Sequence, residues 1–227
     1  MKVLIVVAHP DDEVLGCGGT IGRLVLEGHE IHIAVLGEGI TSRYDTREEA
    51  DSELLVVHRE RCQRAADMLG AKELHTYALP DNRFDTVPLL EVAKIVEELI
   101  SVIGPEVIYT HHGGDLNVDH VVTHRAVLTA TRPIAGHVVK EVYTFEVPSS
   151  TDWSFSQFSP AFRPTVFVEM ADYLENKVAA MECYESEARA FPHPRSPDAL
   201  RALANRWGTA AGLRAAEAFE LVRWVRS

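Results

Sequence analysis

The sequence predicts a single α/β domain whose mostly parallel sheet is flanked by helices on both faces. The chain has 227 residues, of which 46% are hydrophobic, and this is enough for one substantial core. Short apolar runs alternate with longer helical patterns through about two-thirds of the chain. No linker, repeat or low-complexity tract divides it, so we expect residues 1–227 to form one domain.

The first βαβ unit is predicted at the amino end. Residues 3–8 form a continuous apolar run, which is typical of a strand buried on both faces. A helical pattern follows over residues 12–27, and Gly28 is suited to end it. Residues 31–36 then indicate a second buried strand.

The same alternation continues along the chain. Helices are predicted over residues 49–69 and 89–103, each followed by a glycine, with a strand over 74–79 between them. A strand over 106–110, a helix over 119–131 and a strand over 141–147 complete this part. Strands joined by helices predict a parallel sheet.

The last third is less regular. Residues 148–164 are rich in serine and aromatic residues, and a short strand over 165–169 and a helix over 171–190 are predicted after them. Three prolines within residues 192–197 break the chain before a helix that begins near residue 198. The alternation over residues 219–225 fits either a last strand or a helix end.

Composition excludes several classes of function. The chain has 22 Lys+Arg against 34 Asp+Glu, and its net charge of −12 disfavours nucleic acid and anionic membrane surfaces as partners. No apolar run approaches the roughly 20 residues of a membrane span. The 3 cysteines are widely spaced and form no C-x-x-C pair, so we expect a cytoplasmic protein without a disulfide framework.

Polar side chains gather in the loops at residues 8–13 and 111–120, after the first and fourth predicted strands. In such sheets ligands bind at the carboxyl ends of strands where the strand order reverses, so these loops are expected to face each other. Their histidines and carboxylates would repel one another without a counter-ion. Imidazole and carboxylate donors without a thiolate favour zinc or another first-row cation.

Each loop also has a simpler interpretation. Pro10 and the acidic residues after it can mark only a helix start. Asp119 can be a helix N-cap, with His120 an ordinary surface histidine. Their coincidence at one predicted crevice favours the metal site.

The sequence AHPDDE at residues 8–13, with NVDH at residues 117–120, resembles the LmbE/PIG-L-like family of zinc-dependent N-deacetylases. The resemblance extends from Met1 to about Val147. It implies a Rossmann-like fold and a substrate with an N-acetylglucosamine group on an inositol, a lipid, a thiol precursor or another small glycoside.

The resemblance also implies roles for individual residues. His9, Asp12 and His120 would hold one zinc ion, and Asp11 would be the general base that takes a proton from the attacking water. Asp119 would fix the orientation of an imidazole or of neighbouring groups.

Asn117 departs from a common pattern of the family, which often has a histidine there. Its amide can hydrogen-bond an oxyanion but cannot donate a catalytic proton. The acid would then be Asp11, once it has accepted a proton, or another histidine, of which His193 in its proline-framed loop is the first candidate.

For substrate binding we single out Arg43, Arg83 and Arg195. If these arginines converge, they can grip a phosphate through paired N–H donors, as in a phosphorylated or nucleotide-linked sugar. The hypothesis is a metal-dependent amidohydrolase that removes acetate from an N-acetylated amino sugar.

Two alternatives remain at this stage. A nucleotide-dependent Rossmann enzyme is suggested by the GCGG segment at residues 16–19, although these glycines fall inside a predicted helix. A non-catalytic metal- or sugar-binding protein of the same fold is supported only by Asn117. A homo-oligomer stays open.

Overall fold

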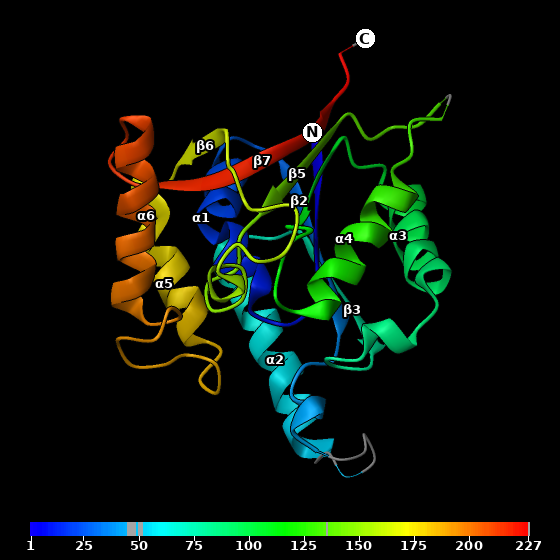
Figure 1. Cartoon of the computed structure of the whole chain (residues 1–227), viewed down its shortest axis with the longest axis horizontal. Coiled ribbons are helices and arrows are strands. Elements are labelled where there is room, and N and C mark those ends of the chain that lie inside the picture. Colours follow the sequence, from blue (N-terminus) through cyan, green and yellow to red (C-terminus); the bar gives the residue numbers. More distant parts are fainter. Residues whose placement is uncertain (45–48, 50–51, 135, 227) are drawn as a thin grey trace.

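The computed structural model describes residues 1–44, 49, 52–134 and 136–226. A seven-stranded sheet of order β3-β2-β1-β4-β5-β7-β6 forms its centre (Figure 1). The strands are β1 Lys2–Val7, β2 Glu30–Gly37, β3 Glu73–Leu79, β4 Val107–His111, β5 Glu141–Phe145, β6 Val166–Glu169 and β7 Ala216–Trp224. The helices are α1 Asp12–Leu26, α2 Ser52–Leu69, α3 Leu89–Ile103, α4 Val118–Ala130, α5 Leu174–Glu182 and α6 Pro197–Ala211.

The sheet is mostly parallel, as predicted. Strands β1 to β5 run parallel to their neighbours, whereas β7 pairs antiparallel with both β5 and β6. The strand order reverses at β1, which has β2 on one side and β4 on the other. The loops after β1 and β4 therefore meet at the switch point, where the sequence predicted the site.

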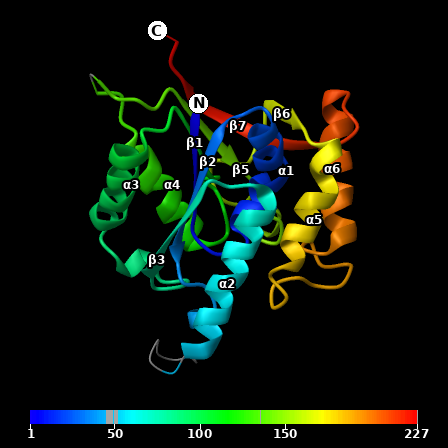
Figure 2. The same ribbon diagram turned by 180° about the vertical axis from the view of Figure 1, so that it is seen from behind.

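Helices cover both faces of the sheet (Figures 1 and 2). Helices α1, α2 and α5 lie on one face, and α3 and α4 lie on the other. Successive residues of β1 enter different cores, because Ile5 and Val7 pack on the first face while Leu4 and Val6 pack on the second. Burial on both faces explains why this strand is a continuous apolar run.

The last third differs from the prediction in one helix. The helix predicted over residues 171–190 is wrong in its extent, because a 3-10 turn at Ala171–Tyr173 precedes α5, which ends at Glu182. The chain turns there and delivers Tyr184 into the core, where its ring is fully buried. The alternation near the carboxyl end belongs to a strand, β7, which begins at Ala216.

Helix α1 is interrupted inside its glycine-rich segment. Cys17 has non-helical angles, with φ of −149°. The backbone groups released there are bound by a buried ion pair from the last third, Lys177 and Glu217, whose Nζ and Oε1 lie 2.7 Å apart. Lys177 donates to the Leu15 carbonyl, and Glu217 accepts from two amides of the following turn. The ion pair thus supplies partners for three backbone groups at this break.

The glycines of this segment serve packing. A Cβ at Gly16 would overlap the Phe145 ring, and one at Gly19 would lie 2.6 Å from the Met170 side chain. The segment lies within α1 and not between strand and helix. The segment therefore does not lie where a dinucleotide-binding loop lies, and its glycines serve packing. It no longer supports the interpretation as a nucleotide-dependent Rossmann enzyme. Among the described residues, no helix has the length and apolar character needed to cross a membrane.

Candidate metal centre and active site

A cavity of about 550 Å³ opens at the carboxyl ends of β1 and β4. One wall comes from the loops after β2, β3 and β4, with Ser42, Asn82 and Asn117. The opposite wall comes from the last third, with Trp153 and Arg195. His9, Asp11 and His120 lie between these walls, so the two loops predicted to face each other do so.

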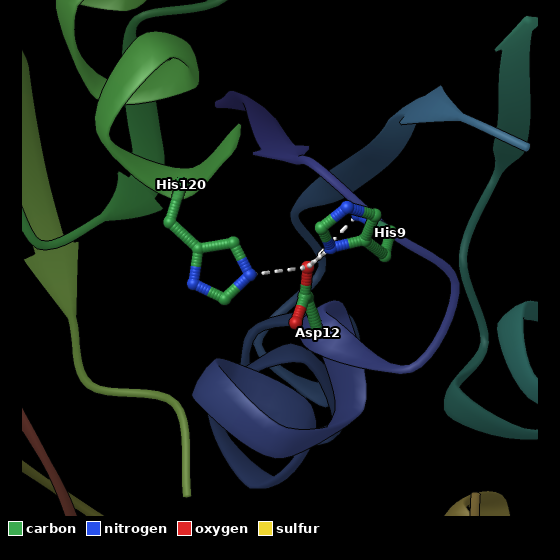
Figure 3. Close-up of side chains that lie close together, drawn as sticks. All are labelled: His9, Asp12 and His120. Carbon is green, nitrogen blue, oxygen red and sulfur yellow. Dashed lines mark hydrogen bonds and ion pairs between the residues drawn. The ribbon is translucent and has the colours of Figure 1, made fainter. Parts of the chain in front are cut away.

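Three side chains converge as candidate metal ligands (Figure 3). His9 lies in the loop after β1, Asp12 is the first residue of α1, and His120 is in the first turn of α4. Asp12 Oδ2 lies 3.4 Å from His9 Nδ1 and 3.3 Å from His120 Nε2. One donor atom from each lies within 4.8 Å of the others. Two imidazoles and one carboxylate are a donor set suited to zinc, so these residues fit such an ion.

Asp119 lies against the His9 ring. The N-cap of α4 is Asn117, whose side-chain oxygen accepts from the Asp119 amide at 2.8 Å, so the N-cap interpretation of Asp119 is wrong. The Asp119 carboxylate instead lies 2.9 Å from His9 Nε2 and accepts from the Asn82 and Phe84 amides. A proton held on Nε2 by Asp119 would leave Nδ1, the nitrogen that faces Asp12, to bind an ion.

His120 has a carboxylate neighbour that sequence reasoning missed. Asp115 Oδ1 lies 3.2 Å from His120 Nδ1. Asp115 also accepts from the Ser150 and Thr151 hydroxyls. Burial opposes ionisation, but His120 and these donors hold the pKa of Asp115 well below its usual range. The available signal was its place five residues before His120 in the same loop.

The other histidines of these loops have further partners, although His111 Nε2 also lies 3.4 Å from Asp12 Oδ2. The His111 ring stacks on His120 with centroids 3.9 Å apart, and its Nε2 accepts from the Ala8 amide at 2.8 Å. His112 turns toward β7, where its Nδ1 lies 2.8 Å from Glu220. His111 therefore ties β4 to β1 beside the ligand group, and His112 lies outside that group.

Asp11 points away from Asp12. Its φ of 101° and ψ of −26° lie in the left-handed region, which a non-glycine residue seldom adopts. This backbone directs its carboxylate toward Arg195, whose Nη1 lies 2.7 Å from Asp11 Oδ2. Burial raises the pKa of Asp11 well above its usual range, and the positive charge of Arg195 opposes that rise. Adjacent aspartates thus face different surroundings.

A buried pair supports the Asp11 backbone. Glu13 accepts from the Asp11 amide at 3.1 Å, and the Tyr184 hydroxyl donates to Glu13 at 2.6 Å. Burial raises the pKa of Glu13 to about 7, although the Tyr184 hydrogen bond acts against this. In the sequence, Glu13 stood out only as one of the acidic residues of a helix start, and no local pattern pointed to Tyr184.

Of the predicted arginines, Arg195 reaches the cavity. Its Nε donates to Ser149 Oγ at 2.9 Å, and its Nη1 lies 3.4 Å from Glu187 Oε2. Arg83 is exposed and is not among the residues that line the cavity. The Arg43 side chain lies outside the part of the chain that the structure describes. The described arginines therefore bring one guanidinium to the site, and that group already contacts carboxylates.

Asn117 and His193 differ in their access to the cavity. Asn117 lines it, and its Nδ2 donates to Asn82 Oδ1 at 3.1 Å. The His193 ring packs edge-on against Trp153 with centroids 5.5 Å apart, and its Nδ1 accepts from the Arg195 amide at 3.1 Å. Trp153 lines the cavity, whereas His193 is not among the lining residues.

The sheet, its switch point and the His-Asp-His group define a Rossmann-like α/β protein with a candidate metal centre. The chain belongs to the PIG-L family, described as GlcNAc-PI de-N-acetylase, whose profile matches residues 4–131 and thus more than half of the chain.

Relatives named as deacetylases match most of the chain. A 1D-myo-inositol 2-acetamido-2-deoxy-alpha-D-glucopyranoside deacetylase of Mycobacterium sp. (strain JLS) is 26% identical over 86% of this chain and 77% of its own length. The diacetylchitobiose deacetylase of Thermococcus kodakarensis is 26% identical over 97% of this chain and 83% of its own. Both relatives are named as deacetylases, which are hydrolases that act on amide bonds.

Solved structures share the fold. The N,N'-diacetylchitobiose deacetylase of Pyrococcus horikoshii superposes with a TM-score of 0.77 at 20% identity, over 98% of this chain and 84% of its own. GalB of Pseudomonas putida KT2440, a 4-carboxy-2-hydroxymuconate hydratase, also has a TM-score of 0.77 at 20% identity, over 100% and 98% of the two chains. Because a hydratase shares the fold, the reaction must be argued from residues.

Proposed function

We propose that this chain is a metal-dependent N-deacetylase that hydrolyses the acetamide of an N-acetylglucosamine-type sugar conjugate. The observation that carries the proposal is the division between two adjacent carboxylates. Asp12 faces two imidazoles, whereas Asp11 lines the cavity and faces Arg195. Membership of a de-N-acetylase family and the named substrates of the two relatives support the substrate class.

We assign His9, Asp12 and His120 to one divalent cation, and we take zinc as that cation. Two imidazole nitrogens and one carboxylate oxygen suit zinc better than calcium or magnesium, which prefer oxygen ligands. When bound, the ion would supply a Lewis acid that activates water and polarises the amide carbonyl. Asp119 and Asp115 would hold the two imidazoles in the orientation that the ion needs.

Asp11 is our general base. It would take a proton from the water whose oxygen attacks the acetyl carbon, and would then give that proton to the sugar nitrogen as the C–N bond breaks. Arg195 would keep the Asp11 carboxylate ionised and correctly placed before the reaction. We assign the acid role to Asp11 ahead of His193, because His193 is not among the residues that line the cavity.

The cavity walls offer groups suited to a sugar. The Asn117 amide nitrogen uses one hydrogen on Asn82, and its second hydrogen is our candidate donor to the developing oxyanion. Trp153 is 44% exposed and lines the cavity, so its indole would pack on an apolar sugar face. Arg195 would contact the substrate only by sharing its guanidinium with Asp11.

We further propose that the protein acts in the cytoplasm, since its three cysteines are free. The net charge of −12 supports a small-molecule substrate over nucleic acid.

The test is turnover of zinc-loaded protein on a panel of N-acetylglucosaminyl conjugates that includes diacetylchitobiose, with mass spectrometry to detect deacetylated product and a separate assay for acetate. Asp11→Asn should lower kcat by about 10²–10⁴-fold, because it removes the base, while its zinc content stays that of the wild type. Asp85→Asn, at an exposed position away from the cavity lining, is the matched control and should behave as wild type.

Near-normal kcat in zinc-loaded Asp11→Asn would remove the proposed base. Stoichiometric zinc in the wild type with no product from any conjugate would instead favour the non-catalytic alternative.

A further inference from the structure

A second group of two histidines and a carboxylate lies at the opposite end of the sheet. His32 is near the start of β2, and Glu73 and His75 are near the start of the edge strand β3. The two strands are parallel, with His32 opposite Glu73 and Ala34 opposite His75. Side chains alternate along a strand, so Glu73 and His75 share one face. Figure 2 shows β2 and β3 side by side.

The donor atoms of this group converge. His32 Nδ1 and His75 Nε2 lie 3.3 Å apart. Glu73 Oε2 lies 3.7 Å from each of these nitrogens. The three atoms therefore form a nearly equilateral triangle with one donor from each residue.

The size of the triangle is that of a metal site. Zinc–nitrogen bonds of about 2.0–2.1 Å in tetrahedral geometry place neighbouring ligand atoms about 3.3 Å apart. The two imidazole nitrogens already have this spacing. The Glu73 side chain is 59% exposed, so it can move the few tenths of an ångström that the third ligand requires.

A fourth residue fixes the histidine that is buried in the sheet. Glu30 Oε1 lies 3.0 Å from His32 Nε2, and the His32 side chain is only 7% exposed. A proton held on Nε2 by this carboxylate would leave the lone pair of Nδ1 directed at His75 and Glu73. A carboxylate on the far nitrogen is the usual way in which proteins orient a metal-binding imidazole.

We propose that His32, Glu73 and His75 form a second cation site, which takes Zn²⁺ or a similar first-row divalent ion and ties β3 to β2. The two histidines and Glu73 supply three ligands, and water completes the coordination at the surface. Because β3 is the edge of the sheet, the ion would pin a strand that has a neighbour on one side only.

This site is separate from the candidate active site. His32 pairs with Leu4 in β1, whereas His9 follows the carboxyl end of that strand. Leu4 and His9 are five positions apart, which corresponds to at most about 17 Å of extended chain. The proposal therefore holds whether or not the chain is a deacetylase.

The test measures zinc bound by the full-length protein after chelation and equilibrium dialysis. The wild type should bind two equivalents. Asp12→Asn should keep the second site and lose the first, and Asp12→Asn with His75→Gln should lose both. His29→Gln, which changes a histidine outside both groups, is the matched control and should keep two equivalents.

Melting curves supply a second readout. In the Asp12→Asn background, added Zn²⁺ should raise Tm with increasing concentration, and adding His75→Gln or Glu73→Gln should remove that rise. Glu73 is exposed, so its variant folds even if a change at His75 does not. Glu30→Gln should weaken binding at this site by about 10–100-fold.

The proposal is overturned if Asp12→Asn binds no zinc, or if the zinc it binds is unaffected by both His75→Gln and Glu73→Gln. In either case the two imidazoles are a hydrogen-bonded pair that shares one proton.

Discussion

The parallel part of the chain and its last third contribute different groups to one cavity. The parallel part supplies the candidate metal ligands, each on a turn at the end of a strand or the start of a helix. The last third supplies Trp153, Glu187 and Arg195, which stand opposite them. The family profile ends at residue 131 and so includes only the first set. The ligand group lies on loops and helix starts of the repeating β/α part. Asp11 is contacted by Arg195 of the less regular last third.

The two regions nevertheless share a core. Phe219 of β7 and Met181 of α5 pack in the same cluster as Ile5 and Val7 of β1. The Lys177–Glu217 pair binds the interruption of α1, which begins at the candidate site. The last third is therefore part of the structure that positions Asp12. Three sets of variants test how strongly the two regions depend on each other.

The largest effect is expected at the buried ion pair. Lys177→Met should lower the free energy of unfolding by about 3–5 kcal/mol, because it leaves the Glu217 charge buried without a cation. If residues 1–227 are one domain, urea denaturation followed by circular dichroism and by tryptophan fluorescence should still give one coincident transition.

The control is Lys140→Met. Lys140 is 51% exposed and pairs with Glu106, so its loss should cost less than about 1 kcal/mol. Two separate transitions would show that the last third unfolds by itself, and equal effects of the two variants would remove the structural role of the buried pair.

An intermediate effect is expected at Arg195, where the two regions meet. Arg195→Gln removes the cation that lowers the pKa of Asp11, so the pKa of the carboxyl rises further and less base is ionised at neutral pH. We expect kcat at pH 7 to fall on the order of tenfold, with the acidic limb of the pH–kcat profile moved to higher pH.

Arg195→Lys keeps the charge and should retain most of the wild-type profile. A profile that does not move in Arg195→Gln would show that the last third has no electrostatic influence on Asp11.

A third effect, which depends on pH, is expected at Glu146, which follows β5 and accepts from the Trp207 indole of α6. Burial raises its pKa from 4.5 to about 7. A raised pKa in the folded state favours folding below about pH 4.5, and this contribution is lost as pH rises through about 7. Glu146→Gln should therefore be more stable than wild type at pH 8 by up to about 3 kcal/mol, and by less than about 1 kcal/mol at pH 5.

Melting temperatures at the two pH values measure this. Glu98→Gln, at an exposed position on α3, should show no such dependence. If Glu146→Gln is less stable than wild type at pH 8, the hydrogen bond from Trp207 to the ionised carboxylate contributes more to stability than burial of that charge costs.

The regular part was predictable because its signals are local. Continuous apolar runs identified β1 and β2, and the rule for parallel sheets placed the loops with His9 and His120 together across more than a hundred residues. The end of α5 at Glu182 was not predictable, since the helical pattern runs past it. The turn there places Tyr184 on Glu13, a contact between residues 171 positions apart.

Local signals in the sequence were enough to predict the sheet, its switch point and the donor set, because apolar periodicity and the spacing of polar residues act over a few residues. Which group faces which became evident only in the folded chain. Asn117 caps α4 and leaves Asp119 for His9, and Arg195 lies on Asp11 and not in an arginine cluster. Such pairings depend on how loops that are distant in sequence are placed relative to one another in the fold. Buried charges and hydrogen-bonding groups then pair with the groups that lie close enough.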